Sequence, residues 1–493
     1  MKEQKRAVVI GAGIGGLASA IRLAIDGFEV TVFEKNSYAG GKNCQLKMDG
    51  YQFDAGPSLF TQPELIEELF KLAGEPIEQY FSYTKQPISC KYFFQDGILI
   101  NGYGDVDDFA AEFHRKVGED ALKVKKYLQQ AEKTYTNIGT LFLNHSLHRL
   151  STLFQSSILK ALKTVKAAFL VNTLNQFNES AFNKPHTVQI FNRYATFNGS
   201  NPYKAPGMLS MIPHLDNNIG TFYPKGGMIS ISTALYKLAL NKGVSFMFNN
   251  EVKSITVENK RAVGVIVNDS SYLADVVISN MDVYFTYQKL LSNPEKAKEV
   301  LKQERSSSAF IFYWGINKQF PELELHNIFF TKNYQAEFES LFTSKELYDD
   351  PTIYINITSK CEPHLHAPEG KENWFVMVNA PANIGQNWQD YYSKYKKIII
   401  DKLNERLNTD IEPLIEVEEV LTPLTMETRT ASFMGSLYGT SSNGKMAAFF
   451  RHPNFSKKIK GLYFVGGSVH PGGGIPLCLQ SAKITCDIIR ESK

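Results

Sequence analysis

The sequence predicts an α/β protein that contains a Rossmann-like nucleotide-binding domain and a second domain with a mixed sheet. Near the N-terminus, a glycine-rich turn separates a short apolar run from a helical segment, VVIGAGIGGLASAIRL. A second turn of this kind, LYFVGGSVHPGGGIP, lies close to the C-terminus. Between them, the runs KYFFQDGILI, FIFYWGI, TIYINIT and WFVMVNA are rich in β-branched and aromatic residues, which favour strands.

Length and composition set the limits of the interpretation. The chain has 493 residues, of which 43% are hydrophobic, so two or three domains are expected. A net charge of +3 is too small to indicate a nucleic-acid partner. Five scattered cysteines favour a reducing cytosol over a disulfide framework. Glycines interrupt the N-terminal apolar run, which argues against a signal peptide, and no run reaches the ~18–20 residues of a spanning helix.

The N-terminal turn has the spacing of a dinucleotide-binding loop. Its first glycine allows a tight turn, the second lets a pyrophosphate approach, and the third lets the helix pack on the strand. The predicted order is a strand at 7–10, a helix at 14–25 and a strand at 29–33. The candidate residues of this loop are Gly11, Gly13, Gly15 and Gly16.

An acidic residue, Glu34, ends the second predicted strand and is followed by Lys35. In this position an acid binds the ribose hydroxyls and disfavours a cofactor with a 2′-phosphate, because like charges would meet. The loop by itself does not distinguish FAD from NAD.

Two further glycine segments, AGGK at 39–42 and FDAGPS at 53–58, follow. With the first loop they resemble the flavoprotein superfamily that includes amine oxidases and carotenoid desaturases. The resemblance implies FAD and a nucleotide domain of the glutathione-reductase type. It also implies that Gly41 and Lys42 lie by the pyrophosphate, and that Asp54 to Ser58, including Gly56 and Pro57, approach the flavin end.

The C-terminal turn is interpreted as the other half of the same FAD site, with a helix N-terminus pointing at the flavin. The sequence of this turn resembles the signature of bacterial-type phytoene and carotenoid desaturases. Amine oxidases usually carry an acid in this strand turn, where this chain has a glycine pair. His470 is a candidate base, and the alternative is a histidine that packs near the cofactor. The residues implied in binding are Gly466, Gly467, Gly474, Ile475 and Pro476.

The middle of the chain continues the resemblance. TFYPKGGM at 221–228 precedes a helix at 229–240, and 246–267 is predicted to form a hairpin that turns at Asn259 and Lys260. By the resemblance Val252 lies beside the adenine. The segment ADVVISNMD at 274–282 is predicted to be a buried strand that brings Asn280 to the cofactor.

The segment RYATFNGSNPYKAP at 193–206 resembles desaturases that act on hydroxylated carotenoids at the 3,4 position more than phytoene desaturases. The alternative is a helix end and loop that do not touch the substrate.

Residues 133–178 contain no acid, and Lys160, Lys163 and Lys166 recur at three-residue spacing among apolar residues. This pattern favours a helix that lies on an anionic membrane surface, and the alternative is a cap helix with a solvated basic edge. We therefore expect a cytoplasmic protein, peripherally associated with the inner face of the cell membrane, that draws a carotenoid from the bilayer.

Three regions are predicted. The FAD-binding domain comprises 1–84, 221–304 and 426–493, the substrate-binding mixed-sheet domain comprises 85–104 and 305–425, and a helical cap covers 105–220. No metal is expected, because Cys361, His364 and His366 have no second cluster to complete a tetrahedral site.

The predicted activity is that of an FAD-dependent carotenoid desaturase, most closely a 1-hydroxycarotenoid 3,4-desaturase. It would introduce a C=C bond into a C40 carotenoid by hydride transfer to flavin N5 and loss of a proton, with a quinone or O₂ as the final acceptor. No catalytic acid–base pair is evident. The alternatives are a phytoene desaturase, a carotenoid isomerase or saturase, a flavin amine oxidase, and a lipid-escort protein that has lost its flavin.

Overall fold

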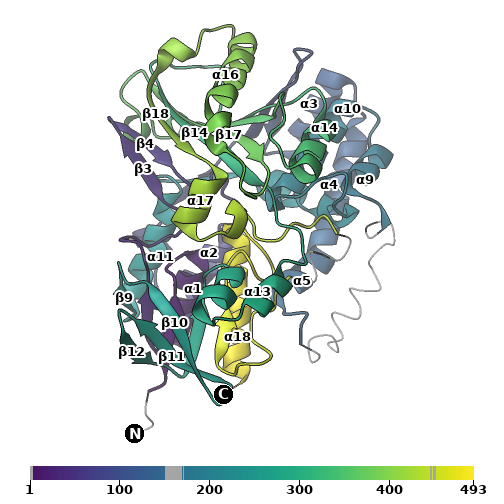
Figure 1. Ribbon diagram of the computed structural model, residues 1–493. Coiled ribbons are helices and arrows are strands. Elements are labelled where there is room, and N and C mark those ends of the chain that lie inside the picture. The colour runs from purple at the N-terminus through teal and green to yellow at the C-terminus, as the bar shows by residue number, and fades with distance from the viewer. Residues whose placement is uncertain (1–3, 150–168, 170, 445–446, 448–450, 493) are drawn as a thin grey trace.

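The computed structural model describes residues 4–149, 169, 171–444, 447 and 451–492. The predicted basic helix with Lys160, Lys163 and Lys166 lies outside the described residues. Figure 1 shows the chain in two halves, with a nucleotide-type sheet and its helices below and a larger sheet with most other helices above. Both termini lie at the lower end.

The lower half is built on a five-stranded sheet whose four pairings are all parallel. Strand β1 is central, and its residues after Arg6 are buried, which explains why they form an uninterrupted apolar run. The strands, in spatial order, are β19 (Leu462–Phe464), β13 (Val276–Ser279), β1 (Arg6–Ile10), β2 (Glu29–Phe33) and β9 (Ser245–Met247).

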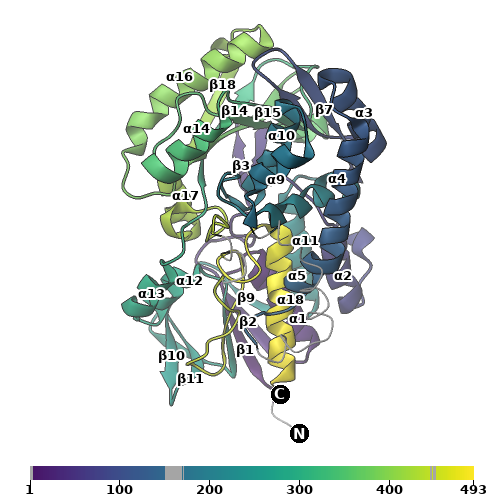
Figure 2. The ribbon, with the colours of Figure 1, turned by 90° about the vertical axis from the view of Figure 1, so that its right-hand side faces the viewer.

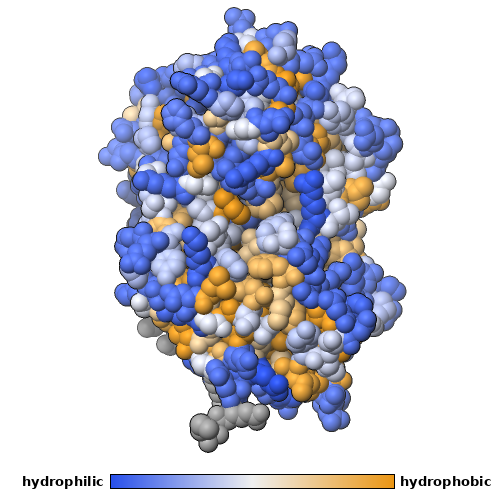
Figure 3. Space-filling model, turned by 90° about the vertical axis from the view of Figure 1, so that its left-hand side faces the viewer, coloured by the Kyte–Doolittle hydropathy of each residue, from blue (hydrophilic) through white to orange (hydrophobic). Residues whose placement is uncertain are grey.

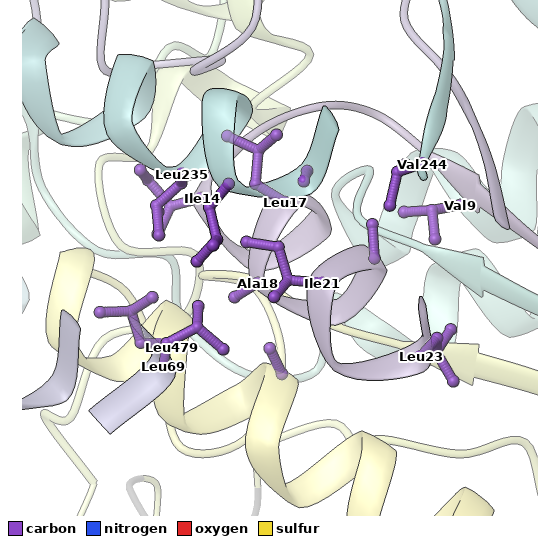
Figure 4. Packing of buried hydrophobic residues seen from close by; sticks show 14 of the residues in the cluster. Val9, Ile14, Leu17, Ala18, Ile21, Leu23, Leu69, Leu235, Val244 and Leu479 are labelled. Carbon is purple, nitrogen blue, oxygen red and sulfur yellow. The ribbon is translucent and has the colours of Figure 1, made fainter. Parts of the chain in front are cut away.

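Helices cover one face of this sheet. Ala7 and Val9 of β1 face a core that contains side chains from four helices. In Figure 4, Leu235 lies beside Ile14, and Leu479 beside Leu69, so α1 is packed between its neighbours. The helices are α1 (Ile14–Ile25), α2 (Glu64–Ala73), α11 (Ile229–Asn241) and α18 (Ile475–Glu491).

A three-stranded antiparallel sheet covers the other face, where Val8 and Ile10 of β1 join its core. The predicted hairpin turn is present, with positive φ at Asn259 (46°) and Lys260 (61°), as a type I′ turn requires. The predicted start of the hairpin is wrong, because Phe246 pairs in parallel with β2 as part of β9. The strands are β10 (Val252–Glu258), β11 (Arg261–Val267) and β12 (Ser270–Leu273).

The upper half contains a seven-stranded sheet in which β15 pairs in parallel with β6 and the other pairings are antiparallel, so the predicted mixed sheet is present. One face packs against α16 (Trp388–Leu407) in an aromatic core around Trp314 and Trp374. In spatial order the strands are β18 (Ile415–Leu421), β14 (Ser308–Ile316), β17 (Glu372–Ala380), β16 (Ile353–Asn356), β15 (His326–Phe329), β6 (Ile88–Phe93) and β7 (Leu99–Tyr103).

Helices from 106–192 pack beside this sheet through a separate core of phenylalanines and leucines. They are α3 (Val106–Val117), α4 (Ala121–Thr134), α9 (Leu174–Ala181) and α10 (Pro185–Asn192). Figure 2 shows them on the side of the upper half, whereas α5 (Thr140–Asn144) lies lower, beside α18.

Shorter elements connect the halves. Asp49 and Gly50 both have positive φ and form the turn between the antiparallel strands β3 and β4. The connecting elements are β3 (Gln45–Met48), β4 (Tyr51–Asp54), β5 (Tyr83–Lys85), β8 (Phe222–Pro224), α12 (Val283–Phe285), α13 (Pro294–Val300), α14 (Tyr334–Glu339), α15 (Pro363–His366) and α17 (Pro423–Thr430).

The surface in Figure 3 is mostly hydrophilic, and hydrophobic residues gather in the lower middle of this face. Within the described part of the chain, no helix is both long enough and apolar enough to cross a bilayer.

Candidate cofactor and substrate site

One cavity of about 580 Å³ is lined by residues of both halves. Of the residues implicated from the sequence in cofactor binding, Gly16 does not line this cavity and the others do. The lining set is Gly11, Gly13, Gly15, Glu34, Lys35, Gly41, Lys42, Gly56, Pro57, Ser58, Val252, Asn280, Gly466, Gly467, Gly474, Ile475 and Pro476.

The two glycine-rich turns meet at the side chain of Asn280. Its amide Nδ2 donates to the Gly11 carbonyl at 3.3 Å. A Cβ on Gly13 would lie 2.8 Å from this nitrogen, and a Cβ on Gly15 would lie 3.1 Å from the backbone nitrogen of Gly466. The glycines are therefore required by close approach, and the second turn closes the same site as the first.

Gly16 lies behind the loop, where a Cβ would be 2.1 Å from the Gly11 carbonyl oxygen. This is the packing role that the third glycine of the spacing predicts. Helix α1 begins after Gly13 with no side-chain cap, so its first N–H groups are available to an anionic ligand.

Glu34 is buried at the end of β2 and has a defined orientation. Its Oε2 accepts from the Ala12 backbone nitrogen at 2.8 Å, and its Oε1 accepts from that of Asn36 at 2.9 Å. A carboxylate has further acceptor capacity, so these two bonds leave Glu34 able to accept from ribose hydroxyls.

The helix α18 presents its N-terminal end to the cavity. In Figure 2 it runs upward from the C-terminus toward the upper half. Its N-cap is Gly474, with a φ of 103° and no side-chain cap, and its first residues line the cavity. The positive end of the helix dipole thus faces the part of the cavity that lies beyond the glycine turns, which we call the chamber.

Two cations, of which Arg451 is buried and Lys42 half-buried, line the cavity near this helix. Burial lowers the pKa of Lys42 to about 8, and its Nζ donates to the carbonyls of Ser436 and Leu437. The guanidinium of Arg451, which sequence reasoning missed, donates to the Tyr438 carbonyl at 3.0 Å. A Cβ on Gly472 would lie 3.2 Å from the Arg451 Cζ, so the glycine turn makes room for it.

His470 does not line the cavity. Its Nε2 lies 3.1 Å from the carbonyl oxygen of Phe142 and 2.9 Å from that of His145, near α5. Burial lowers the pKa of His470 to about 4. The geometry therefore gives this histidine a packing role, and we correct its candidacy as a base.

Asp54 is the last residue of β4 and belongs to the segment at 53–58 that is predicted to approach the flavin. Its hydrogen bonds connect this segment to the turn before α11. Both of its carboxylate oxygens accept from the Met228 backbone nitrogen, at 2.9 and 3.0 Å. Burial raises the pKa of Asp54 to about 7 from its usual 3.8.

Asp54 is expected to make the protein less stable as the pH rises. The native state holds a proton that the unfolded state has lost between about pH 4 and 7, so the free energy of unfolding falls by up to ~1.4 kcal/mol per pH unit. Asp54→Asn removes this contribution. Denaturant unfolding across that range checks it, with Asp401→Asn, at a carboxylate that is 59% exposed, as the control. Parallel pH profiles of wild type and Asp54→Asn would contradict the assignment.

The upper wall of the cavity is one face of the seven-stranded sheet. Alternate residues of β17 point into it, namely Phe375, Met377 and Asn379, and Ile311 and Ile328 extend the face on β14 and β15. Four of these five side chains are apolar, so this wall of the cavity is mostly apolar.

A buried ion pair, between Arg193 and Asp216, lines the chamber. Arg193 Nη2 donates to Asp216 Oδ2 at 3.2 Å and to the Tyr92 hydroxyl at 2.9 Å. Asp216 also accepts from the hydroxyls of Tyr194 and Thr221. Arg193, Thr196, Phe197 and Asn198 all line the cavity, so the RYATF segment contributes to its wall.

The polar residues of the upper chamber, His326, Tyr354 and Asp216, were missed from the sequence. His326 and Tyr354 lie on the paired strands β15 and β16, Asp216 lies in the segment His214–Ile219, and no local motif marks them. Among the described residues, no three His, Cys, Asp or Glu side chains come together as a metal site would require.

The residues present fit a dinucleotide with an aromatic redox ring. Two helix N-termini without side-chain caps suit phosphates, a buried carboxylate suits ribose, and the glycine cradle leads directly into an apolar chamber. Fold and site together define an oxidoreductase of the dinucleotide-binding class.

The chain belongs to the family of flavin containing amine oxidoreductases, whose model matches residues 14–490. As the sequence predicted, its cofactor is FAD. The 1-hydroxycarotenoid 3,4-desaturase of Flavobacterium sp. (strain P99-3) is 51% identical over 485 residues, which are 98% of this chain and 99% of that protein. The 4,4'-diaponeurosporene oxygenase of Staphylococcus aureus (strain MSSA476) is 33% identical over 99% of both chains.

Solved structures share the fold at low sequence identity. An oxidoreductase from Methanosarcina mazei superposes with a TM-score of 0.62 at 17% identity, over 99% of this chain and 100% of that one. Cyclohexylamine oxidase from Brevibacterium oxydans gives a TM-score of 0.61 at 13% identity, over 99% of each chain.

Proposed function

We propose that this protein is a carotenoid desaturase of the 1-hydroxycarotenoid 3,4 type. The observation that carries the proposal is the 51% identity to the Flavobacterium enzyme along nearly the whole of both chains. The apolar chamber beside the nucleotide half supports it, because a polyene needs a long apolar site in contact with the redox ring.

A desaturation removes two electrons and two protons from adjacent carbons. When bound, FAD supplies the acceptor for a hydride. The chain holds the polyene on the apolar face formed by Phe375, Met377 and Ile311, which excludes water from the reacting carbons. The positive end of α18 and the cations Lys42 and Arg451 stabilise negative charge on that side of the chamber.

The carboxylate of Asp216, which lines the upper chamber, already accepts hydrogen bonds from protein side chains. Asp216 accepts from Arg193, Tyr194 and Thr221, so we propose that it orients the wall and does not take the substrate proton. A polyene stabilises the positive charge that develops next to it, and the proton can therefore leave without a strong base.

Membrane association is part of the proposal. The substrate is insoluble, and the segment 133–178 is basic and rich in apolar residues, so we propose a cytoplasmic protein that takes its substrate at the inner face of the cell membrane. We propose a quinone or O₂ as the acceptor that reoxidises the flavin.

The test is an anaerobic titration of the FAD-loaded protein with liposomes that carry single carotenoids. We expect the flavin to bleach while the polyene absorption shifts to longer wavelength with a 1-hydroxycarotenoid. Product analysis then identifies the new double bond.

Other results would assign other functions. A shifted polyene without net flavin reduction indicates an isomerase, and turnover of phytoene alone indicates a phytoene desaturase. Peroxide formation with soluble amines, without any carotenoid turnover, would reject the proposal in favour of an amine oxidase.

A further inference from the structure

One histidine of the upper chamber, His326, has a ring nitrogen without a hydrogen-bond partner in the part of the chain that the structure describes. His326 begins β15, lines the cavity and is 2% exposed. Its Nδ1 lies 2.7 Å from the Tyr354 hydroxyl and 3.2 Å from Asn356 Nδ2. Its Nε2 is buried and has no hydrogen-bond partner among the described residues.

The neighbours of the ring determine where its proton sits. Asn356 Nδ2 donates to the Leu325 carbonyl at 3.1 Å, which orients the amide with its nitrogen toward His326. Nδ1 therefore faces a donor and must accept, so the proton is on Nε2. Burial and the nearby Arg193 lower the pKa of His326 to about 3, so the ring is neutral. The result is an N–H donor that has no acceptor among the residues described.

Apolar side chains of the cavity wall surround this donor. Ile328 lies two residues further along the same strand and also lines the cavity, as do Met377 and Phe375 of the apolar wall. An unsatisfied donor in such a chamber is unfavourable unless a ligand brings an acceptor. The neutral ring, with Nε2 protonated, is also unsuited to act as a base.

His326 is connected to the predicted flavin end of the site. The Tyr354 hydroxyl that contacts Nδ1 lies 2.9 Å from Ser58 Oγ, and Ser58 belongs to the glycine segment at 53–58. Two hydrogen bonds therefore link the free donor to the segment proposed to approach the reacting ring. Ser58, Tyr354 and His326 all line the cavity, so a substrate oxygen bound by His326 would lie on the same side of it as this segment.

We propose that the Nε2–H of His326 donates a hydrogen bond to the hydroxyl oxygen of the substrate and so determines specificity for an oxygenated end group. This inference rests on the proposed function. In a 1-hydroxycarotenoid, C1 carries the hydroxyl and C2 alone separates it from the C3–C4 bond. Holding the hydroxyl therefore sets the register of that bond, and a hydrocarbon end leaves the donor unpaired.

The test compares two substrates that differ only in this hydroxyl, a 1-hydroxycarotenoid and its deoxy analogue, both in liposomes. For His326→Leu we expect kcat/KM to fall by about 10–100-fold with the hydroxylated substrate and by less than ~3-fold with the deoxy one. His326→Gln keeps an N–H donor and should recover part of the loss. FAD content and thermal unfolding are measured for each variant.

Ile328→Ala is the matched control, because it shortens a neighbouring side chain on the same strand that cannot bind the hydroxyl. It should lower kcat/KM for both substrates to a similar extent. A His326→Leu variant that also loses both activities equally would overturn the proposal.

Two outcomes do not depend on how the variants fold. A wild-type protein that turns over both substrates with equal kcat/KM overturns the role of His326 and leaves the desaturase function standing. A wild-type protein that turns over neither removes the proposed function itself, and with it this inference.

Discussion

Replacing Gly16 with alanine is expected to abolish FAD retention. The added Cβ would lie 2.1 Å from the Gly11 carbonyl oxygen and 3.2 Å from Asn280 Nδ2. Gly11 cannot retreat freely, because its backbone nitrogen donates to the Phe33 carbonyl at 2.8 Å. Helix α1 must therefore move off β1, and its N-terminus moves with it.

A shift of α1 would affect both glycine turns of the cofactor site. Asn280 contacts both glycine turns, so a shift of α1 also disturbs the closing turn at Gly466. We expect FAD affinity to fall by at least ~100-fold, as for ångström-scale displacement of a positioned group, and stability to fall by ~1–3 kcal/mol. The FAD-to-protein absorbance ratio and thermal unfolding measure these effects.

Gly27→Ala is the matched control for this change. Gly27 has a φ of 85°, and a Cβ there would meet no atom of the described residues within 4 Å. The variant should lose about 1–2 kcal/mol from left-handed strain and keep its FAD. A Gly16→Ala protein that holds stoichiometric FAD and unfolds at the wild-type temperature would show that the loop packs differently from this description.

The second large effect is expected at Asp216. Asp216→Ala leaves the guanidinium of Arg193 buried over the rings of Tyr92, Tyr194 and Phe197 without its carboxylate. Breaking one side of a buried pair costs ~3–5 kcal/mol, because the remaining charge stays desolvated. Denaturant unfolding of the FAD-loaded protein measures the loss.

Two comparisons separate charge from packing. The double variant Arg193→Met, Asp216→Leu should recover most of the stability, because an apolar replacement of a buried pair is often neutral. Asp401→Ala, which breaks the exposed pair with Lys397, should cost less than about 1 kcal/mol. Equal losses for Asp216→Ala and Asp401→Ala would mean that the Arg193 charge is solvated in the native protein.

Much of the nucleotide half could be predicted because its signals are local. The glycine spacing, the apolar run before it and the acid after the second strand predicted α1 at 14–25 and β2 at 29–33, and the structure has the same bounds. Glycine spacing reflects how closely backbone segments approach, and apolar periodicity reflects burial. Both properties are written in a few consecutive residues.

Other features depended on contacts that no short segment encodes. The alternating apolar residues around Phe246 fit either a strand of a hairpin or an edge strand of the parallel sheet. In the structure this segment pairs in parallel with β2, so it is the edge strand. The loop of His470 was predicted correctly as a turn before a helix, but the direction of its ring depends on the backbone of α5, which packs against α18.

By itself, the sequence determined the glycine turns that line the cavity, the family and the carotenoid chemistry that the resemblance implied. The tertiary structure alone decided that Arg193 meets Asp216, and that Ser58, His326 and Tyr354 form one hydrogen-bonded chain. A period of two tells which residues share a face of a strand, but not which strand lies opposite. Chemistry that depends on strand order, such as the free donor of His326, therefore emerges only when the seven-stranded sheet has formed.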